Sequence, residues 1–140
     1  MDVLYHSPVI TCMEASLARG ITINEELKSI LLKVSHKKIS VHLKGGEKIN
    51  SNAIKKLFNN KRIRFLSTEE LKYFNLEKGL VNPWNIPFCE YNLISANIFE
   101  LNFMFTNNSK YNEGVKFPTQ ELLHLSNLII GDFSYEPKQN

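Results

Sequence analysis

Two apolar runs separated by a short polar segment constrain the fold of this chain more than any other feature. Residues 30–34 and 39–43 are rich in β-branched and aliphatic side chains, and the polar residues 35–38 between them are typical of a turn. Gly45 and Gly46 follow the second run and interrupt a regular continuation. The pattern predicts a β-hairpin, which needs further elements to cover its apolar side chains.

Three segments carry the signals of helices that would cover such a sheet. Thr11 and Glu14 form a capping-box pattern, and Gly20 is a suitable end for the helix that begins there. Residues 51–58 place apolar side chains on one face, and Ser67 opens a further capped helix. Other elements are expected as strands at residues 62–66, 91–95, 98–105 and 115–117 and as a last helix from Pro118. This irregular alternation predicts an α+β fold with a mixed, mostly antiparallel sheet.

The composition predicts an ordinary globular domain. The chain has 140 residues, of which 43% are hydrophobic and 22% charged, so residues 1–140 are expected to form a single domain with a mobile tail at 135–140. No apolar run approaches the roughly 18 residues that span a bilayer, and the N-terminus lacks the pattern of a secretory signal. Cys12 and Cys89 form no framework, which favours reduced cysteines in a cytoplasmic protein.

The positive charges gather in two clusters although the net charge of +3 is mild. The first contains Lys55, Lys56, Lys61, Arg62 and Arg64, and the second Lys33, Lys37, Lys38 and Lys44. Two solvated faces explain these clusters as the ordinary alternative. The charge permits contact with nucleic acid without requiring it, because aromatic residues for base stacking are not interleaved with the lysines.

Several enzyme classes leave signatures that this sequence lacks. It contains no glycine-rich nucleotide-binding loop, no Cys-x-x-Cys and no His-x-x-x-His. His36 and His42 could share one face of the hairpin, but a solvated pair is the more ordinary interpretation than a metal site. We therefore expect neither a metal nor a cofactor.

A lysine and a loop remain as the most informative polar features. Lys28 lies within an apolar stretch, and burying an unpaired ammonium is costly, so it is expected to face an anionic or carbonyl-rich partner. Residues 79–83 form a Gly-x-x-x-Pro loop that offers fixed backbone donors and acceptors to a ligand. The alternatives are an edge-strand lysine that guards against aggregation and an ordinary turn. Together the two features predict a small pocket that binds a charged ligand.

Five segments in order resemble the YbaK/prolyl-tRNA synthetase editing (INS-like) family. They are residues 6–15, which match its helix entry; 26–33, which match its lysine strand; 41–50, a glycine-terminated strand; 65–71, a strand-to-helix step; and 79–83, its Gly-x-x-x-Pro loop. The resemblance extends across residues 6–84 and continues loosely to Asp132.

The resemblance implies an α+β domain whose sheet is barrel-like and surrounded by short helices. It implies a free-standing deacylase that hydrolyses the ester bond of a mischarged tRNA in trans, with a small amino acid as in Ala- or Cys-tRNA(Pro). Its partners would be the acceptor end of the aminoacyl-tRNA and an aminoacyl-tRNA synthetase. The catalytic candidates are Lys28 and Gly79. The substrate-binding candidates are Leu80, Val81, Asn82, Pro83, Met104 and Thr106, and the tRNA-binding candidates are Lys55, Lys56, Arg62 and Arg64.

The segment 101–108 departs from the family pattern. Many synthetase-type members carry a histidine near this strand, and Met104 takes that place here. Thr106 could supply the hydroxyl of YbaK-like members, whereas Asn107 or Asn108 replaces their glycine. Two alternatives therefore stay open: a binding module that recognises an aminoacyl or nucleotide-like ligand without catalysis, and an interaction domain that docks onto a synthetase through the basic clusters.

Overall fold

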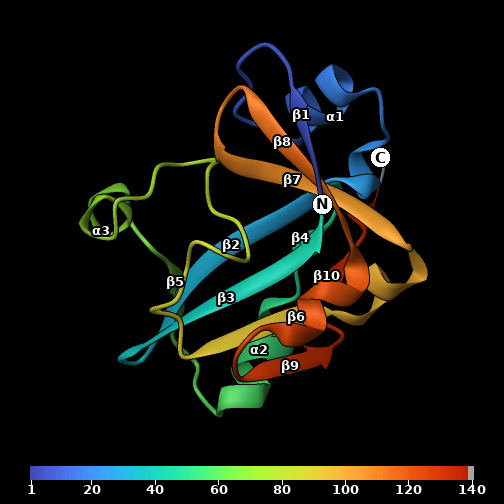
Figure 1. The fold of residues 1–140 in the computed structure, drawn as a ribbon. Helices are drawn as coiled ribbons and strands as arrows, with labels where there is room; N and C mark the ends of the chain where they lie inside the picture. Colours follow the sequence, from blue (N-terminus) through green and yellow to red (C-terminus); the bar gives the residue numbers. More distant parts are fainter. Residues whose placement is uncertain (139–140) are drawn as a thin grey trace.

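The computed structural model describes residues 1–138, and a five-stranded sheet runs through the middle of the molecule (Figure 1). The strands lie in the order β5-β2-β3-β6-β9, antiparallel from β5 to β3 and parallel from β3 to β9. Their bounds are Leu27–Val34 (β2), Lys37–Lys44 (β3), Ile63–Phe65 (β5), Tyr91–Ser95 (β6) and Leu128–Gly131 (β9).

The predicted hairpin is confirmed as β2 and β3, and it is longer than the two apolar runs. Pairing extends from Leu27 opposite Lys44 to Val34 opposite Lys37, so the turn contains only two residues. Ser35, the first of them, has the positive φ of 57° that a tight hairpin turn requires. Lys37 and Lys38, which we expected in the turn, therefore belong to β3.

A second, three-stranded sheet lies beside the first. It contains β1 (Asp2–Tyr5), β8 (Glu113–Pro118) and β7 (Phe103–Lys110), all antiparallel. A single parallel bridge from Glu26 to Phe105 connects β7 with the start of β2. A short ladder pairs β4 (Lys48–Ile49) with β10 (Ser134–Tyr135).

The sheets are mixed and mostly antiparallel, as predicted, but they do not close into a barrel. The two edge strands of the five-stranded sheet, β5 and β9, are not hydrogen-bonded to each other in the described part of the chain. One bridge instead of a ladder joins the two larger sheets, so the barrel-like expectation is wrong in this respect.

Three short α-helices begin at side-chain caps. In α1 (Cys12–Arg19), Thr11 and Glu14 form the predicted capping box, and Gly20 ends the helix in the left-handed conformation with φ of 69°. Asn50 caps α2 (Ser51–Phe58), and Ser67 caps α3 (Thr68–Tyr73). Three 3-10 segments complete the elements: η1 (Ile23–Glu25), η2 (Ala96–Glu100) and η3 (Thr119–His124).

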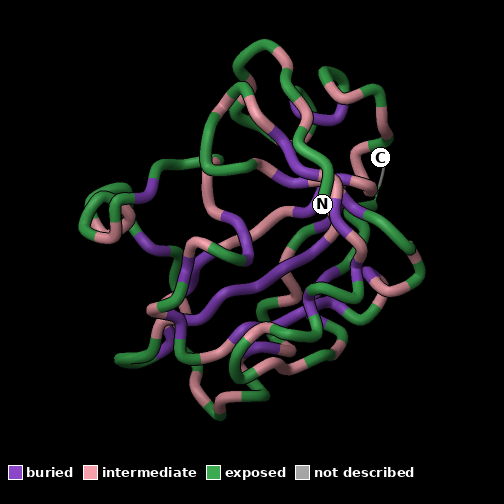
Figure 2. The backbone as a smooth tube through the Cα atoms, in the orientation of Figure 1, coloured by how far each residue is buried: buried purple, intermediate pink, exposed green. Residues whose placement is uncertain are grey.

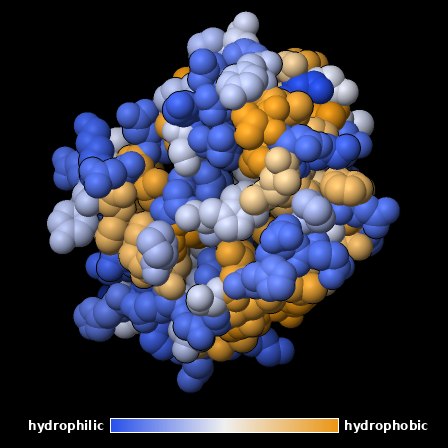
Figure 3. Space-filling model, viewed as in Figure 1, coloured by the Kyte–Doolittle hydropathy of each residue, from blue (hydrophilic) through white to orange (hydrophobic). Residues whose placement is uncertain are grey.

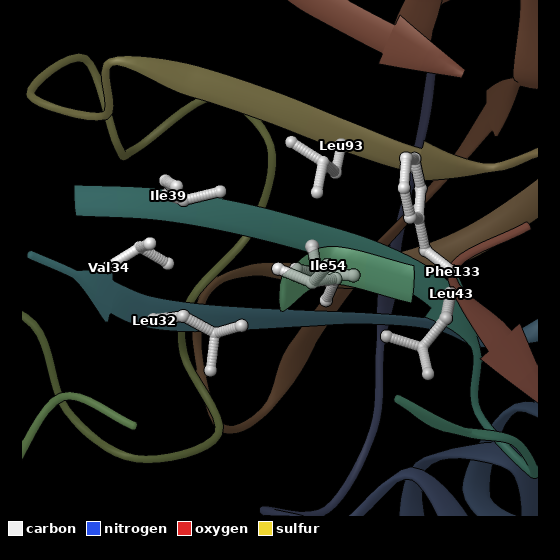
Figure 4. Packing of buried hydrophobic residues seen from close by; sticks show 8 residues of the cluster. Leu32, Val34, Ile39, Leu43, Ile54, Leu93 and Phe133 are labelled. Carbon is white, nitrogen blue, oxygen red and sulfur yellow. The ribbon is translucent and has the colours of Figure 1, made fainter. Parts of the chain in front are cut away.

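The core lies on both faces of the five-stranded sheet, and the buried residues follow β2, β3 and β6 in Figure 2. Between this sheet and α2, a cluster that includes Leu32, Ile39, Ile54 and Leu93 is almost fully buried (Figure 4). The opposite face of the sheet packs against β7 and β8 through a cluster that includes Leu27, Ile94, Met104 and Phe117. A third cluster, under α3, contains Leu31, Leu66, Leu76, Ile86 and Cys89.

The surface mixes polar and apolar side chains (Figure 3). Several large apolar residues are more than half exposed, among them Tyr5, Leu17, Phe65 and Tyr73. Within residues 1–138, no helix has the length and apolar character needed to cross a membrane.

Some sequence-based element predictions differ from the structure. The strand expected at 98–105 is divided, because η2 occupies its first part and β7 begins only at Phe103. The last helix is the 3-10 segment η3, and the sequence did not reveal β1, β4, β9 or β10. Tyr135, the first residue of the predicted mobile tail, pairs with Lys48 in a strand, whereas residues 139–140 of that tail lie outside the described residues.

Candidate functional site

Two adjoining cavities open where β2, the entry to α1 and the 79–83 loop meet. The outer cavity has a volume of about 740 Å³, and the inner one about 80 Å³. The outer cavity extends toward α3, and the inner one toward the end of β7. The residues that line both are Ile10, Thr11, Cys12, Lys28, Ser29, Gly79 and Val81.

Lys28 lies on β2 in the wall between the two cavities. It is half-buried, and its Nζ donates to the carbonyl oxygen of Glu47 at 2.5 Å. That acceptor is held in place because the Glu47 carboxylate accepts hydrogen bonds from Asn97 and Ser134. Burial lowers the pKa of Lys28, an effect that the charge of Glu47 partly offsets. The lysine thus has the carbonyl partner that its apolar surroundings predicted.

Gly79 lines the same two cavities as Lys28. Its φ is +85°, and a Cβ atom at this position would lie 2.7 Å from the carbonyl oxygen of Ile10. Only glycine fits both the backbone conformation and this close approach. The lack of a side chain at Gly79 therefore lets the loop lie close to the segment that leads into α1.

Two asparagines fasten the 79–83 loop to β7. Asn82 Nδ2 donates to Asn107 Oδ1 and to Ser109 Oγ, both at 3.2 Å, and Asn107 Nδ2 donates to the Val81 carbonyl at 2.9 Å. Asn82 is 4% exposed, so these bonds form away from water. The loop is therefore a fixed wall of the site, with its backbone groups already oriented.

The remaining substrate-binding candidates separate into those at the cavities and those beneath them. Val81 lines both cavities, whereas Leu80 lines a separate depression near the end of α3. Asn82 and Pro83 are buried and are absent from the lining of the two cavities. Asn82 and Pro83 therefore support the loop from beneath and do not face the cavities.

Met104 and Thr106 do not reach the site. Both are at most 1% exposed, Met104 belongs to the core cluster with Phe117, and neither lines a cavity. Because side chains alternate along a strand, the residue of this segment that lines the inner cavity is Asn107. The sequence-based prediction chose the strand that reaches the inner cavity, β7, but chose Met104 and Thr106, whose side chains are on the face turned away from that cavity.

The predicted tRNA-binding residues lie outside both cavities. Lys55 and Lys56 are on α2, which contributes no residue to the cavity lining, and Arg62 precedes β5. Arg64 forms a two-point ion pair with Glu70, with contacts of 2.6 and 3.0 Å, which raises the pKa of Arg64 and lowers that of Glu70 to about 2. A role of these residues in tRNA contact stays a prediction.

A buried ion pair under the inner cavity had no clear sequence signal. Arg19, from the last turn of α1, contacts Glu26 at the start of β2, and both side chains are at most 4% exposed. Burial raises the pKa of Glu26, and Arg19 acts in the opposite direction. The pair connects α1 to the start of β2. Arg19 and Glu26 belong to different elements, so no local sequence pattern predicts their contact.

The two cysteines are protonated thiols. Burial raises the pKa of Cys12, which lines both cavities, to about 11, and that of Cys89, in the core, to about 12. A thiol with so high a pKa is a poor nucleophile at neutral pH. Within residues 1–138, no group of three or more metal-ligating side chains stands together.

A chain of polar side chains leads inward from the cavity wall. Ser29 Oγ is 2.8 Å from His42 Nδ1, and His42 Nε2 is 3.0 Å from Ser40 Oγ. His42 is fully buried, and burial lowers its pKa to about 4. Sequence reasoning compared His42 only with His36, because its true partner lies opposite it on the neighbouring strand.

Comparisons with known proteins concern the family of the sequence and the likeness of the fold. The family model described as "Aminoacyl-tRNA editing domain" matches residues 6–122. No curated protein matches the sequence closely enough to count as a relative. The structure of a hypothetical protein has a TM-score of 0.86 at 19% identity and covers 96% of this chain and 91% of its own. A structure described as "a putative trans-editing enzyme for prolyl tRNA synthetase" has a TM-score of 0.82 at 15% identity, with coverages of 96% and 86%. At these identities the likeness shows a common fold.

Proposed function

Because the chain belongs to the aminoacyl-tRNA editing domain family, we propose that it is an aminoacyl-tRNA deacylase that acts in trans in the cytoplasm. Its substrates would be mischarged tRNAs with a small amino acid, of the Ala- or Cys-tRNA(Pro) type. The observation that supports this proposal most is the pairing of Lys28 with Gly79 in one cavity system. A lysine and a fixed backbone loop can together hold the ester end of an aminoacyl-tRNA.

The size and polarity of the cavities suit such a substrate. The outer cavity, at about 740 Å³, has the volume of a small-molecule site and can admit the terminal nucleoside with its amino acid. Its lining combines apolar side chains, including Ile10 and Phe65, with Lys28. The inner cavity, at about 80 Å³, is small enough to favour a short side chain. We therefore place the nucleoside in the outer cavity and the amino acid at the inner one.

The proposed reaction is hydrolysis by a positioned water molecule. Water attacks the ester carbonyl carbon, the bond from this carbon to the ribose oxygen breaks, and the proton released by the water goes to that oxygen. Lys28 and the backbone N–H groups of Gly79 and Val81 would stabilise the negative charge on the carbonyl oxygen. An aminoacyl ester is activated, so orientation and electrostatic stabilisation can supply the acceleration without a strong base.

A panel of mischarged tRNAs tests the proposal. The wild-type protein is expected to deacylate at least one member, and Lys28→Ala to lose about 100-fold or more of that activity, as for removal of an oxyanion donor. Lys33→Ala is the matched control, because Lys33 lies on the same strand but lines neither cavity. Equal activity of the two variants would remove Lys28 from the mechanism.

The same panel separates the two other classes of function. The absence of turnover for every substrate, with retained binding of a stable aminoacyl-adenosine analogue, would identify a binding module in place of an enzyme. A synthetase-docking domain would instead lose its partner when Lys55, Lys56, Arg62 and Arg64 are reversed in charge, and would tolerate Lys28→Ala.

A further inference from the structure

Four polar side chains connect the cavity wall to the interior through two cross-strand pairs. Ser29 on β2 lies opposite His42 on β3, and Ser40 on β3 lies opposite Asn92 on β6. Ser40 Oγ is 2.5 Å from Asn92 Oδ1, which completes the chain that begins at Ser29. His42, Ser40 and Asn92 are at most 5% exposed, whereas Ser29 lines both cavities.

The inner end of the chain determines where each hydrogen lies. Asn92 Nδ2 donates to the Ser126 carbonyl at 2.8 Å, so its Oδ1 is the atom that faces Ser40. An amide oxygen only accepts, and the single hydroxyl hydrogen of Ser40 must therefore point to Asn92. Ser40 Oγ is left as an acceptor toward His42, which places the hydrogen of the imidazole on Nε2.

The imidazole then fixes the hydroxyl at the cavity wall. His42 is fully buried, and its pKa of about 4 keeps it neutral near pH 7. With its hydrogen on Nε2, its Nδ1 has only a lone pair and accepts from Ser29. The single hydroxyl hydrogen of Ser29 therefore points away from the cavity, and the lone pairs of Ser29 Oγ are free to accept hydrogen bonds from a ligand.

We propose that Ser29 is a substrate-positioning residue whose hydroxyl oxygen accepts a hydrogen bond from a donor group on the aminoacyl end, with His42 enforcing that polarity. This inference rests on the proposed function of the cavity. Two groups of an aminoacylated terminal adenosine carry such a donor next to the ester: the α-ammonium of the amino acid and the neighbouring ribose hydroxyl. A site that only accepts at this point discriminates against a ligand that lacks the donor.

The same geometry argues against Ser29 as a nucleophile. A serine that attacks an ester must pass its proton to the adjacent base, which here is His42. The resulting imidazolium would be buried among Ser40, Asn92 and apolar neighbours, and burial disfavours that charged form. Ser29 is therefore assigned to binding and orientation.

Three stable analogues test the assignment by calorimetry. In 3′-(alanylamino)-3′-deoxyadenosine an amide replaces the ester, its propionyl counterpart lacks the α-amino group, and its 2′-deoxy counterpart lacks the ribose hydroxyl. Wild-type protein is expected to bind the first about tenfold more tightly than whichever counterpart lacks the recognised donor. In Ser29→Ala this ratio falls to near one, and the affected ratio identifies the donor.

Matched variants separate recognition from structural damage. Ser29→Thr keeps the hydroxyl and is expected to retain the ratio, and so is Ser51→Ala, which changes an exposed serine of α2. Unchanged ratios for both counterparts in Ser29→Ala would overturn the inference, and so would failure of all three analogues to bind the wild-type protein. Binding of the analogues does not require turnover. If no mischarged tRNA is deacylated but the affinity ratio still falls to near one in Ser29→Ala, the proposed enzymatic activity is contradicted and the role of Ser29 in binding is not.

Nitrogen NMR of the wild-type protein tests the polarity directly. At pH 7 the ¹⁵N-labelled ring of His42 is expected to carry its hydrogen on Nε2, with Nδ1 unprotonated. A hydrogen on Nδ1 would make Ser29 a donor toward the ligand and would contradict the assignment. A covalent acyl-serine detected by mass spectrometry after mixing with substrate would do the same.

Discussion

Gly79 combines two demands that other residues cannot meet together, and its replacement is the sharpest test of the loop at the residue scale. Gly79→Ala must hold an alanine at φ of +85° and move its Cβ away from the Ile10 carbonyl. We expect a loss of about 1–3 kcal/mol in the free energy of unfolding, measured with urea, together with reduced deacylation.

Gly20→Ala is the matched control for this change. Gly20 also has a positive φ, of +69°, but its Cβ would meet no atom within 4 Å. We expect a smaller cost, from the backbone conformation alone, and unchanged deacylation. Equal effects of the two variants would show that the contact with Ile10 is unimportant.

His42 makes the stability of the protein sensitive to mild acid. Its pKa is about 4 in the folded state and near 6.5 when unfolded, so between these values the unfolded chain binds more protons. Stability from this group is complete above pH 6.5 and is lost as the pH falls toward 4. We expect the free energy of unfolding to fall by about 2–3 kcal/mol between pH 7 and pH 4.5 from this residue.

Urea unfolding of His42→Gln at both pH values measures this contribution. The variant is expected to be less stable at pH 7 and to show a smaller decrease on acidification. His36→Gln, at the exposed hairpin turn, should retain the decrease of the wild type. A decrease of the same size in His42→Gln would contradict the burial of a neutral imidazole.

Single residues were predictable where the chemistry is local in sequence. Lys28 is recognisable as a charge within an apolar run, and Gly79 as the start of a Gly-x-x-x-Pro loop. Ser29 and His42 come together only through the register of the β2–β3 hairpin, which no local pattern specifies. Met104 was assigned to the site because it takes the place of a histidine in the family pattern, but on β7 it lies on the opposite face from Asn107, three positions later.

At the scale of elements, hydrogen bonds of Asn82 and Asn107 hold the 79–83 loop against β7. Asn82→Ala removes the donor to Asn107 and Ser109 and also the side-chain oxygen that accepts from the Trp84 backbone N–H. We expect each of Asn82→Ala and Asn107→Ala to lower the free energy of unfolding by about 1–3 kcal/mol. The double variant should cost less than the sum, by about 0.5–2 kcal/mol, because the two residues share hydrogen bonds.

Denaturant unfolding of the two single variants and the double variant gives this coupling energy. Asn108→Ala is the control, since Asn108 is exposed on the same strand and bonds only to Glu113 among the described residues. Strict additivity of Asn82→Ala and Asn107→Ala would show that the loop and the strand are held independently.

The predictability of elements followed the strength of their local signals. Capping residues located α1 and α3, and the apolar periodicity of residues 51–58 located α2 at the same bounds as in the structure. The hairpin was predictable because its two strands are adjacent in sequence. β1 has four residues and pairs with β8, which is more than a hundred residues later in the sequence. β9 pairs in parallel with β6, from which it is separated in the sequence by η2, β7, β8 and η3. Such partners are set by tertiary packing, which local propensity does not encode.

At the scale of the whole molecule, the basic residues of α2 lie apart from the two cavities, whose lining includes no residue of that helix. If the body of the tRNA reaches α2, Lys55→Glu with Lys56→Glu should weaken binding of full-length tRNA and reduce its salt dependence by about one to two units of slope. Binding of an aminoacyl-adenosine analogue should be unchanged. Lys116→Glu with Lys138→Glu makes the same change of charge at two lysines that lie outside α2 and line neither cavity, and provides the control. Unaltered tRNA binding by the α2 variant would confine recognition to the acceptor end.

The fold class was predictable from the whole pattern, but closure of the sheets was not. The family match and the structural likeness agree with the mixed α+β architecture that the sequence indicated. The barrel-like expectation required β7 to join β2 through a full ladder, whereas the structure has one bridge at Glu26 and Phe105. β2 pairs with β3 and β7 pairs with β8, and this bridge is the one pairing between β2 and β7 in the described residues.

The central claim is that the cavity shared by Lys28 and Gly79 is the aminoacyl site, and amide NMR during titration with 3′-(alanylamino)-3′-deoxyadenosine tests it most directly. We predict that the largest saturable changes in chemical shift belong to the amides of Ser29, Gly79 and Val81, which line both cavities. The amide signals of α2 should not shift. Shifts concentrated on α2 and β5, with the amides of Ser29 and Gly79 unmoved, would contradict the account.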